Sequence, residues 1–244
     1  MRRRIVLILL LGTFIGLTIW IPTIGKVGIY NVFTYEQILH QSWDHFKMVA
    51  IAALIAIAIG VPLGILVTRP GFTGLSLPVI GGAGVGQSIP SMAVIAIMAP
   101  LLGFGFRSAV VALIIYGLLP ILRNSYAAIR NIDPAMIEAA RGMGMSKGQI
   151  AWRIELPLAR PVIMAGIRTS TVINVGTAAL AVLVGGKGLG TSILTGVFSR
   201  QPLITLEGAA PLAAMAITLD YILEAIENWM TPRGLKVMAE RGEV

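Results

Sequence analysis

Three charged residues stand inside apolar stretches of this chain and could form an ion pair within a membrane. Asp220 and Glu224 lie four residues apart, so a helix would place both carboxylates on one face. Arg168, in the preceding apolar stretch, is a plausible cationic partner. Carboxylates inside a membrane are costly and usually face a partner or a water path. The spacing therefore predicts a structural or gating ion pair, against the alternative that all three side chains extend to water at the membrane interface.

Catalytic chemistry has little support in the remaining residues. The sequence contains no cysteine, which excludes disulfides, thiolate metal sites and cysteine nucleophiles. Gly188 stands where a phosphate-binding loop around Lys187 would need Ser or Thr, and Gly-x-Ser-x-Gly does not occur. His40 and His45 are off the spacing of metalloprotease helices, and we expect them at the surface. We predict a protein that is not an enzyme and has no catalytic residue, metal or cofactor.

The composition indicates that lipid surrounds most of the chain. Of the 244 residues, 56% are hydrophobic and only 12% are charged, and the mean hydropathy is +0.86. At about 20 apolar residues per spanning helix, we predict an all-α membrane protein with about six transmembrane helices. The third segment is broken by Gly and Pro, and the fourth is short for a span. The predicted spans are 5–24, 48–67, 77–102, 108–122, 161–184 and 208–229.

The basic residues predict the orientation of these spans. Most of the 19 Lys and Arg residues fall in cytoplasmic segments if the N-terminus lies inside the cell, and the C-terminus is then cytoplasmic as well. They are spread between apolar stretches rather than gathered on one face, which argues against nucleic acid as a partner. The predicted parts are an N-terminal transmembrane helix with an outer interfacial segment (1–43), a transmembrane core (44–227) with a cytoplasmic loop (123–160), and a cytoplasmic tail (228–244).

The polar loop carries two helix-start signals. Asp133 can cap a helix whose first residue is Pro134, and that helix should stop at Gly142. Ser146 and Gln149 have the spacing of a capping box and predict a second short helix, which we expect Pro157 to close. Two short helices meeting at a Gly-containing elbow form a knob that can sit in a groove of another protein. The alternative is an ordinary loop with two surface helices.

The polar loop contains Glu138-Ala139-Ala140, then Gly144, then Ile154-Glu155-Leu156-Pro157. This spacing resembles the EAA motif of the coupling loop in bacterial ABC-importer permeases. The chain resembles, over residues 44–227, permease subunits with the type I, methionine-permease-like membrane fold. Phrases such as Gly86-Gln87-Ser88-Ile89-Pro90-Ser91 and Gly166-Ile167-Arg168-Thr169-Ser170 are most similar to the osmoprotectant branch. The residues that match the coupling motif are Glu138, Ala139, Ala140, Gly144, Ile154, Leu156 and Pro157.

This resemblance implies a function in the bacterial cytoplasmic (inner) membrane. The chain would be the permease subunit that moves glycine betaine, carnitine, choline or a related solute by alternating access. The implied partners are two ABC ATPase subunits, a second permease subunit of the same or a different chain, a periplasmic or lipid-anchored solute-binding protein, and membrane lipid. The alternatives are a permease for another small solute such as an amino acid, or a channel or carrier that needs no ATPase.

Small and polar residues in two spans are candidates for the translocation path. Helix packing explains such residues equally well; Gly60 and Gly64, for example, have a spacing that lets another helix approach closely. The candidate path residues are Gln87, Ser88, Pro90, Asn174 and Thr177.

Overall fold

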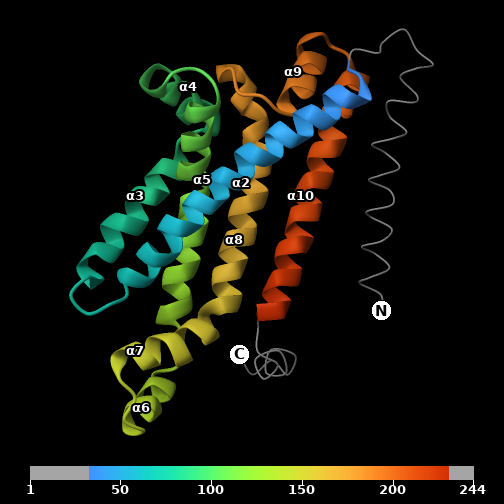
Figure 1. Cartoon of the computed structure of the whole chain (residues 1–244). Coiled ribbons are helices and arrows are strands. Elements are labelled where there is room, and N and C mark those ends of the chain that lie inside the picture. Colours follow the sequence, from blue (N-terminus) through green and yellow to red (C-terminus); the bar gives the residue numbers. More distant parts are fainter. Residues whose placement is uncertain (1–32, 231–244) are drawn as a thin grey trace. The chain divides into compact units, whose positions relative to one another are not determined.

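The computed structural model describes residues 33–230, and helices connected by short turns make up this part of the chain (Figure 1). The predicted first span at 5–24 and residues 231–244 of the predicted tail lie outside the described residues. The main helices are α2 (Tyr35–Leu66), α3 (Ser76–Ser88), α4 (Ser91–Leu102), α5 (Phe106–Arg130), α6 (Pro134–Gly142), α7 (Lys147–Ile150), α8 (Leu156–Ala178), α9 (Gly190–Phe198) and α10 (Pro202–Met230).

Four stretches of helix within residues 33–230 are long and apolar enough to cross a membrane, or five if the bent pair of α3 and α4 counts as one span. The break between α3 and α4 falls at Ile89–Pro90, as the Gly- and Pro-rich composition of this segment predicts. The fourth segment is longer than predicted, because α5 has 25 residues. In contrast, α9 has nine residues and a length of about 14 Å, which is too short to span.

The second predicted span begins earlier in the structure than its apolar run. Thr34 and Gln37 cap the start of α2 reciprocally: Thr34 N donates to Gln37 Oε1 at 2.8 Å, and Gln37 N donates to Thr34 Oγ1 at 3.3 Å. The helix then continues for 32 residues. The interfacial segment predicted up to residue 43 therefore includes the first turns of α2.

The chain forms two compact units, each with its own apolar core. The first unit comprises 89–114, 171–219 and the described residues up to 53, and the second comprises 54–88, 115–170 and the described residues from 220. The core of the first unit contains Met48, Val49, Ala52, Ala109, Val110, Leu113, Val175, Ala178 and Ala181. The core of the second unit contains Ala56, Ile121, Ala128, Ile129, Ala159, Ile163, Met164 and Ile167.

Glycines allow the helices of the second unit to approach closely. A Cβ atom at Gly64 would lie 2.7 Å from the carbonyl oxygen of Leu122, and one at Gly166 would lie 2.8 Å from that of Pro120. Gly60 faces the side chains of Leu118 and Ile121. The Gly60/Gly64 spacing thus has the packing role predicted for it, with α5 as the neighbouring helix.

Candidate functional site

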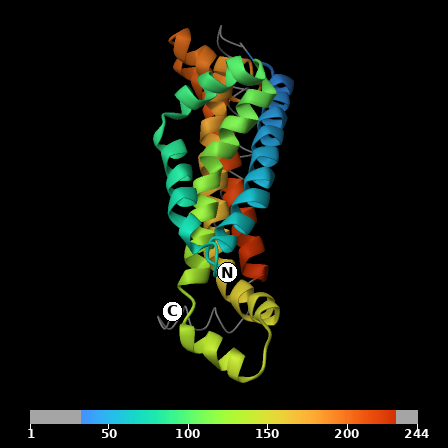
Figure 2. The same ribbon diagram turned by 90° about the vertical axis from the view of Figure 1, so that its left-hand side faces the viewer.

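The polar loop of the second unit folds into a hairpin of two short helices. In Figures 1 and 2 this hairpin, formed by α6 and α7, extends beyond the end of α5 and the start of α8. Asp133 Oδ1 accepts a hydrogen bond of 2.9 Å from Ala135 N, and Pro134 occupies the first turn. Both helix-start signals read from the sequence are present, since Ser146 and Gln149 form the complete capping box before α7.

Gly144 makes the elbow between the two helices. Its φ is +77°, in the left-handed region that side chains other than glycine rarely adopt. The amide of Met145 bonds to the carbonyl of Ala140 at 3.1 Å, and the amide of Gly144 bonds to that of Arg141 at 2.9 Å. These two bonds are those of a Schellman motif, which satisfies the last carbonyls of α6. The glycine of the coupling motif is therefore required by the backbone conformation of the turn.

The expectation that Pro157 closes the second helix is wrong. After α7 the chain passes through a π-helical turn, η2 (Ala151–Glu155), and continues directly into α8. Leu156 N donates to the carbonyl of Ala151, five residues back. Pro157 is the second residue after this π-helical turn, where the altered backbone ladder accommodates a residue that has no N–H. α5 reaches Arg130 and α8 begins at Leu156, so both helices extend into the predicted cytoplasmic loop at 123–160, whose bounds stay a prediction.

An ion pair attaches the return side of the hairpin to the turn after α2. Arg69 Nη1 lies 2.5 Å from Glu155 Oε2, a close ion pair without the alignment of a hydrogen bond. The Glu155 side chain is 13% exposed and that of Arg69 is 31% exposed. Sequence reasoning missed this contact, since no local spacing relates the two residues.

The matched residues of the coupling motif divide between the interior and the surface of the hairpin. Ala140 is only 1% exposed and is the buried residue of α6, while Ile150 is the buried residue of α7. Glu138, Ala139 and Gly144 are exposed. The remaining three, Ile154, Leu156 and Pro157, are partly buried where the hairpin joins α8.

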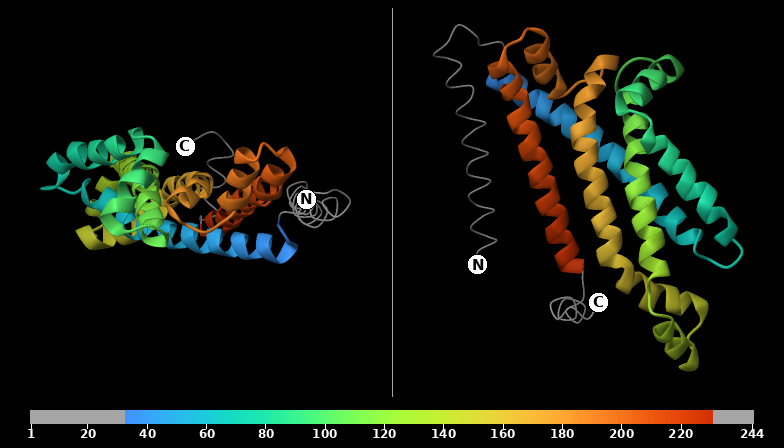
Figure 3. Two further views of the ribbon diagram at one scale, coloured as in Figure 1. Left: turned by 90° about the horizontal axis from the view of Figure 1, so that it is seen from above. Right: turned by 180° about the vertical axis from the view of Figure 1, so that it is seen from behind.

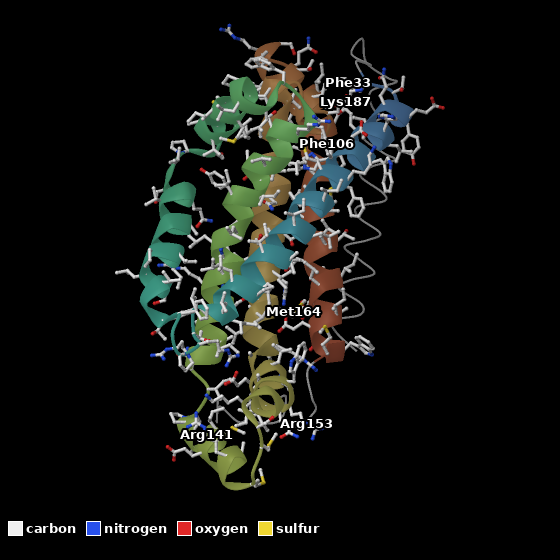
Figure 4. The ribbon with its side chains drawn as sticks, turned by 60° about the vertical axis from the view of Figure 1, so that its left-hand side comes forward. Phe33, Phe106, Arg141, Arg153, Met164 and Lys187 are labelled. Carbon is white, nitrogen blue, oxygen red and sulfur yellow. The ribbon has the colours of Figure 1, made fainter. Side chains whose placement is uncertain are left out.

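Large apolar side chains and basic residues are also exposed on the hairpin. Met143 and Trp152 are each 73% exposed. Arg141 and Arg153 lie on the same hairpin (Figure 4) and are likewise exposed. Apolar side chains at the centre of a charged surface are typical of a protein contact. Trp152 went unnoticed in the sequence, although a lone Trp in a polar loop is a usable signal.

The structure brings Arg168 together with Asp220 and Glu224 in the second unit. The guanidinium bonds Asp220 through two atoms, Nε to Oδ1 at 2.8 Å and Nη2 to Oδ2 at 3.0 Å. Nη2 also lies 3.4 Å from Glu224 Oε2, and Nη1 lies 3.1 Å from Glu227 Oε2. The segments that carry these residues, in α8 and α10, run side by side in the right-hand view of Figure 3.

Glu227 is the member of this ion network that sequence reasoning missed. It stands three residues after Glu224, so the spacing of the three acidic residues repeats one helix face and could have revealed it. The network holds one cation against three carboxylates. All four side chains are partly buried, with exposed fractions between 22% and 37%. A structural or gating role for the network remains a prediction.

The five candidate path residues do not belong to one unit. Gln87 and Ser88 of the second unit line a pocket of about 470 Å³. Pro90, Asn174 and Thr177 belong to the first unit. There, Pro90 precedes the first turn of α4 and Thr177 is partly buried. Asn174 is fully buried, and no residue in the described part of the chain forms a hydrogen bond with its amide.

The expectation that both histidines lie at the surface is wrong for His45. Its side chain is fully buried in the first unit, and Nε2 lies 3.0 Å from the carbonyl oxygen of Val175. His40 is exposed and lies 3.1 Å from Asp44, one helical turn away. Both histidines belong to α2, and the face of this helix that carries His45 is buried within the first unit. Within residues 33–230 no group of three or more His, Cys, Asp or Glu residues could hold a metal ion.

The arrangement of helices matches solved membrane transporters. Chains of the MetNI methionine ABC transporter, in inward-facing conformations from two crystal forms, superimpose with a TM-score of 0.71 and 24% sequence identity. The match covers 80% of this chain and 96% or 97% of those chains. The fold is thus the type I ABC importer permease fold. The fold defines the structural class of the chain, and its family membership defines its role.

The chain belongs to the binding-protein-dependent transport system inner membrane component family, which matches residues 60–235. It is accordingly a multi-pass protein of the cytoplasmic membrane. Relatives include the choline transport system permease protein OpuBB of Bacillus subtilis, 40% identical over 84% of this chain and 93% of that protein. The glycine betaine/carnitine/choline permease OpuCB of the same organism is 41% identical over 84% and 93%. The carnitine permease OpuCB of Listeria monocytogenes is 40% identical over 85% and 94%.

Proposed function

We propose that this chain is the permease subunit of an ATP-driven importer that moves an osmoprotectant across the cytoplasmic membrane. The solute is glycine betaine, carnitine, choline or a related compatible solute. The observation that carries this proposal is the similarity of about 40% over most of the chain to several permeases of such solutes. The N- and C-termini and the hairpin face the cytoplasm, in line with the distribution of basic residues.

The hairpin is the part of the chain that contacts the ATPase and transmits its conformational change to the spans. Two ATPase subunits each hold one permease subunit, and the exposed Glu138, Ala139 and Met143 of the hairpin face the ATPase. A solute-binding protein delivers the solute on the outer side. ATP binding and hydrolysis favour different conformations of the spans, and this differential stability produces alternating access.

Reconstitution of the purified complex tests the proposal. The chain is co-purified with its ATPase, any second permease and the solute-binding protein, and is placed in lipid vesicles. We expect uptake of at least one of the three solutes that requires both ATP and the binding protein. Uptake by the chain alone, without ATPase or ATP, would show instead a channel or carrier.

Gly144 gives a sharper test of the role of the hairpin. We expect Gly144→Ala to destabilise the elbow by about 1–2 kcal/mol, because a side chain disfavours the left-handed conformation. ATP-driven uptake and co-purification of the ATPase should both fall. Gly144→Asn should lose less, since Asn tolerates this conformation better.

Gly142→Ala is the matched control for this substitution. Gly142 ends α6, does not have a positive φ, and has no atom within 4 Å of an added Cβ. We expect its uptake to equal that of the unaltered complex. Equal losses from both glycines would show that the left-handed turn is not what coupling requires.

A further inference from the structure

One pocket in the second unit is lined by glycines and by polar and charged side chains as well as by apolar ones. It lies between α3 and α5, has a volume of about 470 Å³, and is open on one side. Figure 2 shows α3 alongside this part of α5. The residues that line it are Gly81, Gly84, Val85, Gln87 and Ser88 of α3 with Leu119 and Arg123 of α5.

The glycines of α3 that line the pocket are not explained by packing within the chain. An added Cβ at Gly81 or Gly84 would have no atom within 4 Å, and α3 has no buried residue. Gly86 differs, because its Cβ would meet Ile115 at 3.2 Å. A glycine inside a helix costs roughly 0.5–1 kcal/mol relative to alanine. Within residues 33–230 of the chain this cost is not offset by a helix contact at Gly81 or Gly84, and it leaves open space beside the backbone there.

Arg123 is the charged group of this lining. Its side chain is exposed, and no carboxylate within residues 33–230 forms an ion pair with it. Gln87 Nε2 reaches the carbonyl of Tyr116 only at 3.5 Å, the limit of a hydrogen bond, so its amide is weakly held. The pocket therefore offers a guanidinium with no carboxylate partner among the described residues, beside a weakly held amide.

Glycine betaine has no N–H or O–H to donate, so its carboxylate makes its directional hydrogen bonds. Carnitine has a carboxylate and a hydroxyl, whereas choline has a hydroxyl alone. Moving a carboxylate out of water is costly unless a cation pairs with it. The planar guanidinium of arginine matches a carboxylate through two parallel bonds. A cationic solute without a carboxylate would gain at most a hydrogen bond to its hydroxyl from the same group and would be repelled by its charge.

We propose that Arg123 in the α3–α5 pocket receives the carboxylate of a zwitterionic solute, so that this pocket favours glycine betaine and carnitine over choline. This inference rests on the proposed function and assigns the solute-contacting residues of the second unit. Gln87 contributes its amide to the carboxylate, and Gly81 and Gly84 leave room for the quaternary ammonium end.

The test compares uptake of the three solutes by reconstituted complexes at saturating, solute-loaded binding protein. We expect Arg123→Gln to reduce the ratio of glycine betaine or carnitine uptake to choline uptake by about tenfold, the loss of one charge-assisted hydrogen bond. Arg123→Lys should give an intermediate uptake ratio, since lysine keeps the positive charge but lacks the planar guanidinium that donates two parallel hydrogen bonds. Stimulation of ATP hydrolysis by the binding protein should persist, because the hairpin is intact.

Arg130→Gln is the matched control, because Arg130 is an exposed arginine at the end of the same helix that does not line the pocket. It should leave the uptake ratio unchanged. An equal loss for all three solutes, no loss for any, or an unaltered complex that carries choline alone would overturn the inference while leaving the proposed function in place. Uptake of none of the solutes by the unaltered complex would overturn both.

Discussion

Replacing Arg168 by methionine should produce the largest loss of stability and transport among single substitutions in the second unit. The change leaves Asp220, Glu224 and Glu227 as neighbouring carboxylates without their shared cation. The expected cost is roughly 2–3 kcal/mol, between about 1 kcal/mol for an exposed pair and the larger cost of orphaning a buried charge. The measurements are the yield of assembled complex, its thermal melting in detergent, and ATP-driven uptake.

Two further variants separate charge from shape in this network. Arg168→Lys should recover only part of the loss, because lysine cannot form the two-atom contact with Asp220. Arg168→Asp combined with Asp220→Arg should recover more than either change alone. An Arg168→Met chain that inserts, assembles and transports normally would show that these side chains merely extend to water.

Gly64→Ala should have the second largest effect, through helix packing. The new Cβ would lie 2.7 Å from both the Leu122 carbonyl oxygen and Ser125 Cβ, so α2 and α5 must separate. Overpacking of this kind costs about 1–3 kcal/mol. Thermal melting of the purified complex measures it, and Gly64→Val should melt at a still lower temperature.

Gly82→Ala is the matched control for Gly64→Ala. Gly82 is also a glycine within a helix of the second unit, but no atom lies within 4 Å of its added Cβ. We expect the melting temperature to stay the same or rise slightly, because alanine is the better helix former. If both alanine variants melt at the same temperature, close approach at Gly64 does not stabilise the unit.

The features predicted well from sequence are those that depend on a few consecutive residues. The caps at Asp133 and Ser146 follow from side chains that bond their own backbone, so spacing alone reveals them. The broken third segment follows in the same way from Gly and Pro. Pro157 was misjudged because a π-helical turn just before it lets the helix continue past a residue without an N–H, and no local spacing signals that turn.

The features missed from sequence depend on residues far apart in the chain. Glu155 meets Arg69 from a distant segment, and no period or spacing signals that contact. His45 is buried in a contact with a residue 130 positions away, since its Nε2 lies 3.0 Å from the carbonyl oxygen of Val175. The pocket beside Arg123 is likewise a product of two helices. Composition identifies the chain as a membrane protein, but these polar contacts can be identified only in the folded structure.

The Arg69–Glu155 ion pair limits how the hairpin can move. A hairpin joined only to α5 and α8 could swing about those two connections as a hinged flap. The third attachment, at the turn after α2, removes that freedom, so a push on the hairpin must displace the end of α2 as well. If the hairpin couples to an ATPase as proposed, a displacement of its tip would reach the end of α2 as well as α5 and α8 for as long as this ion pair holds.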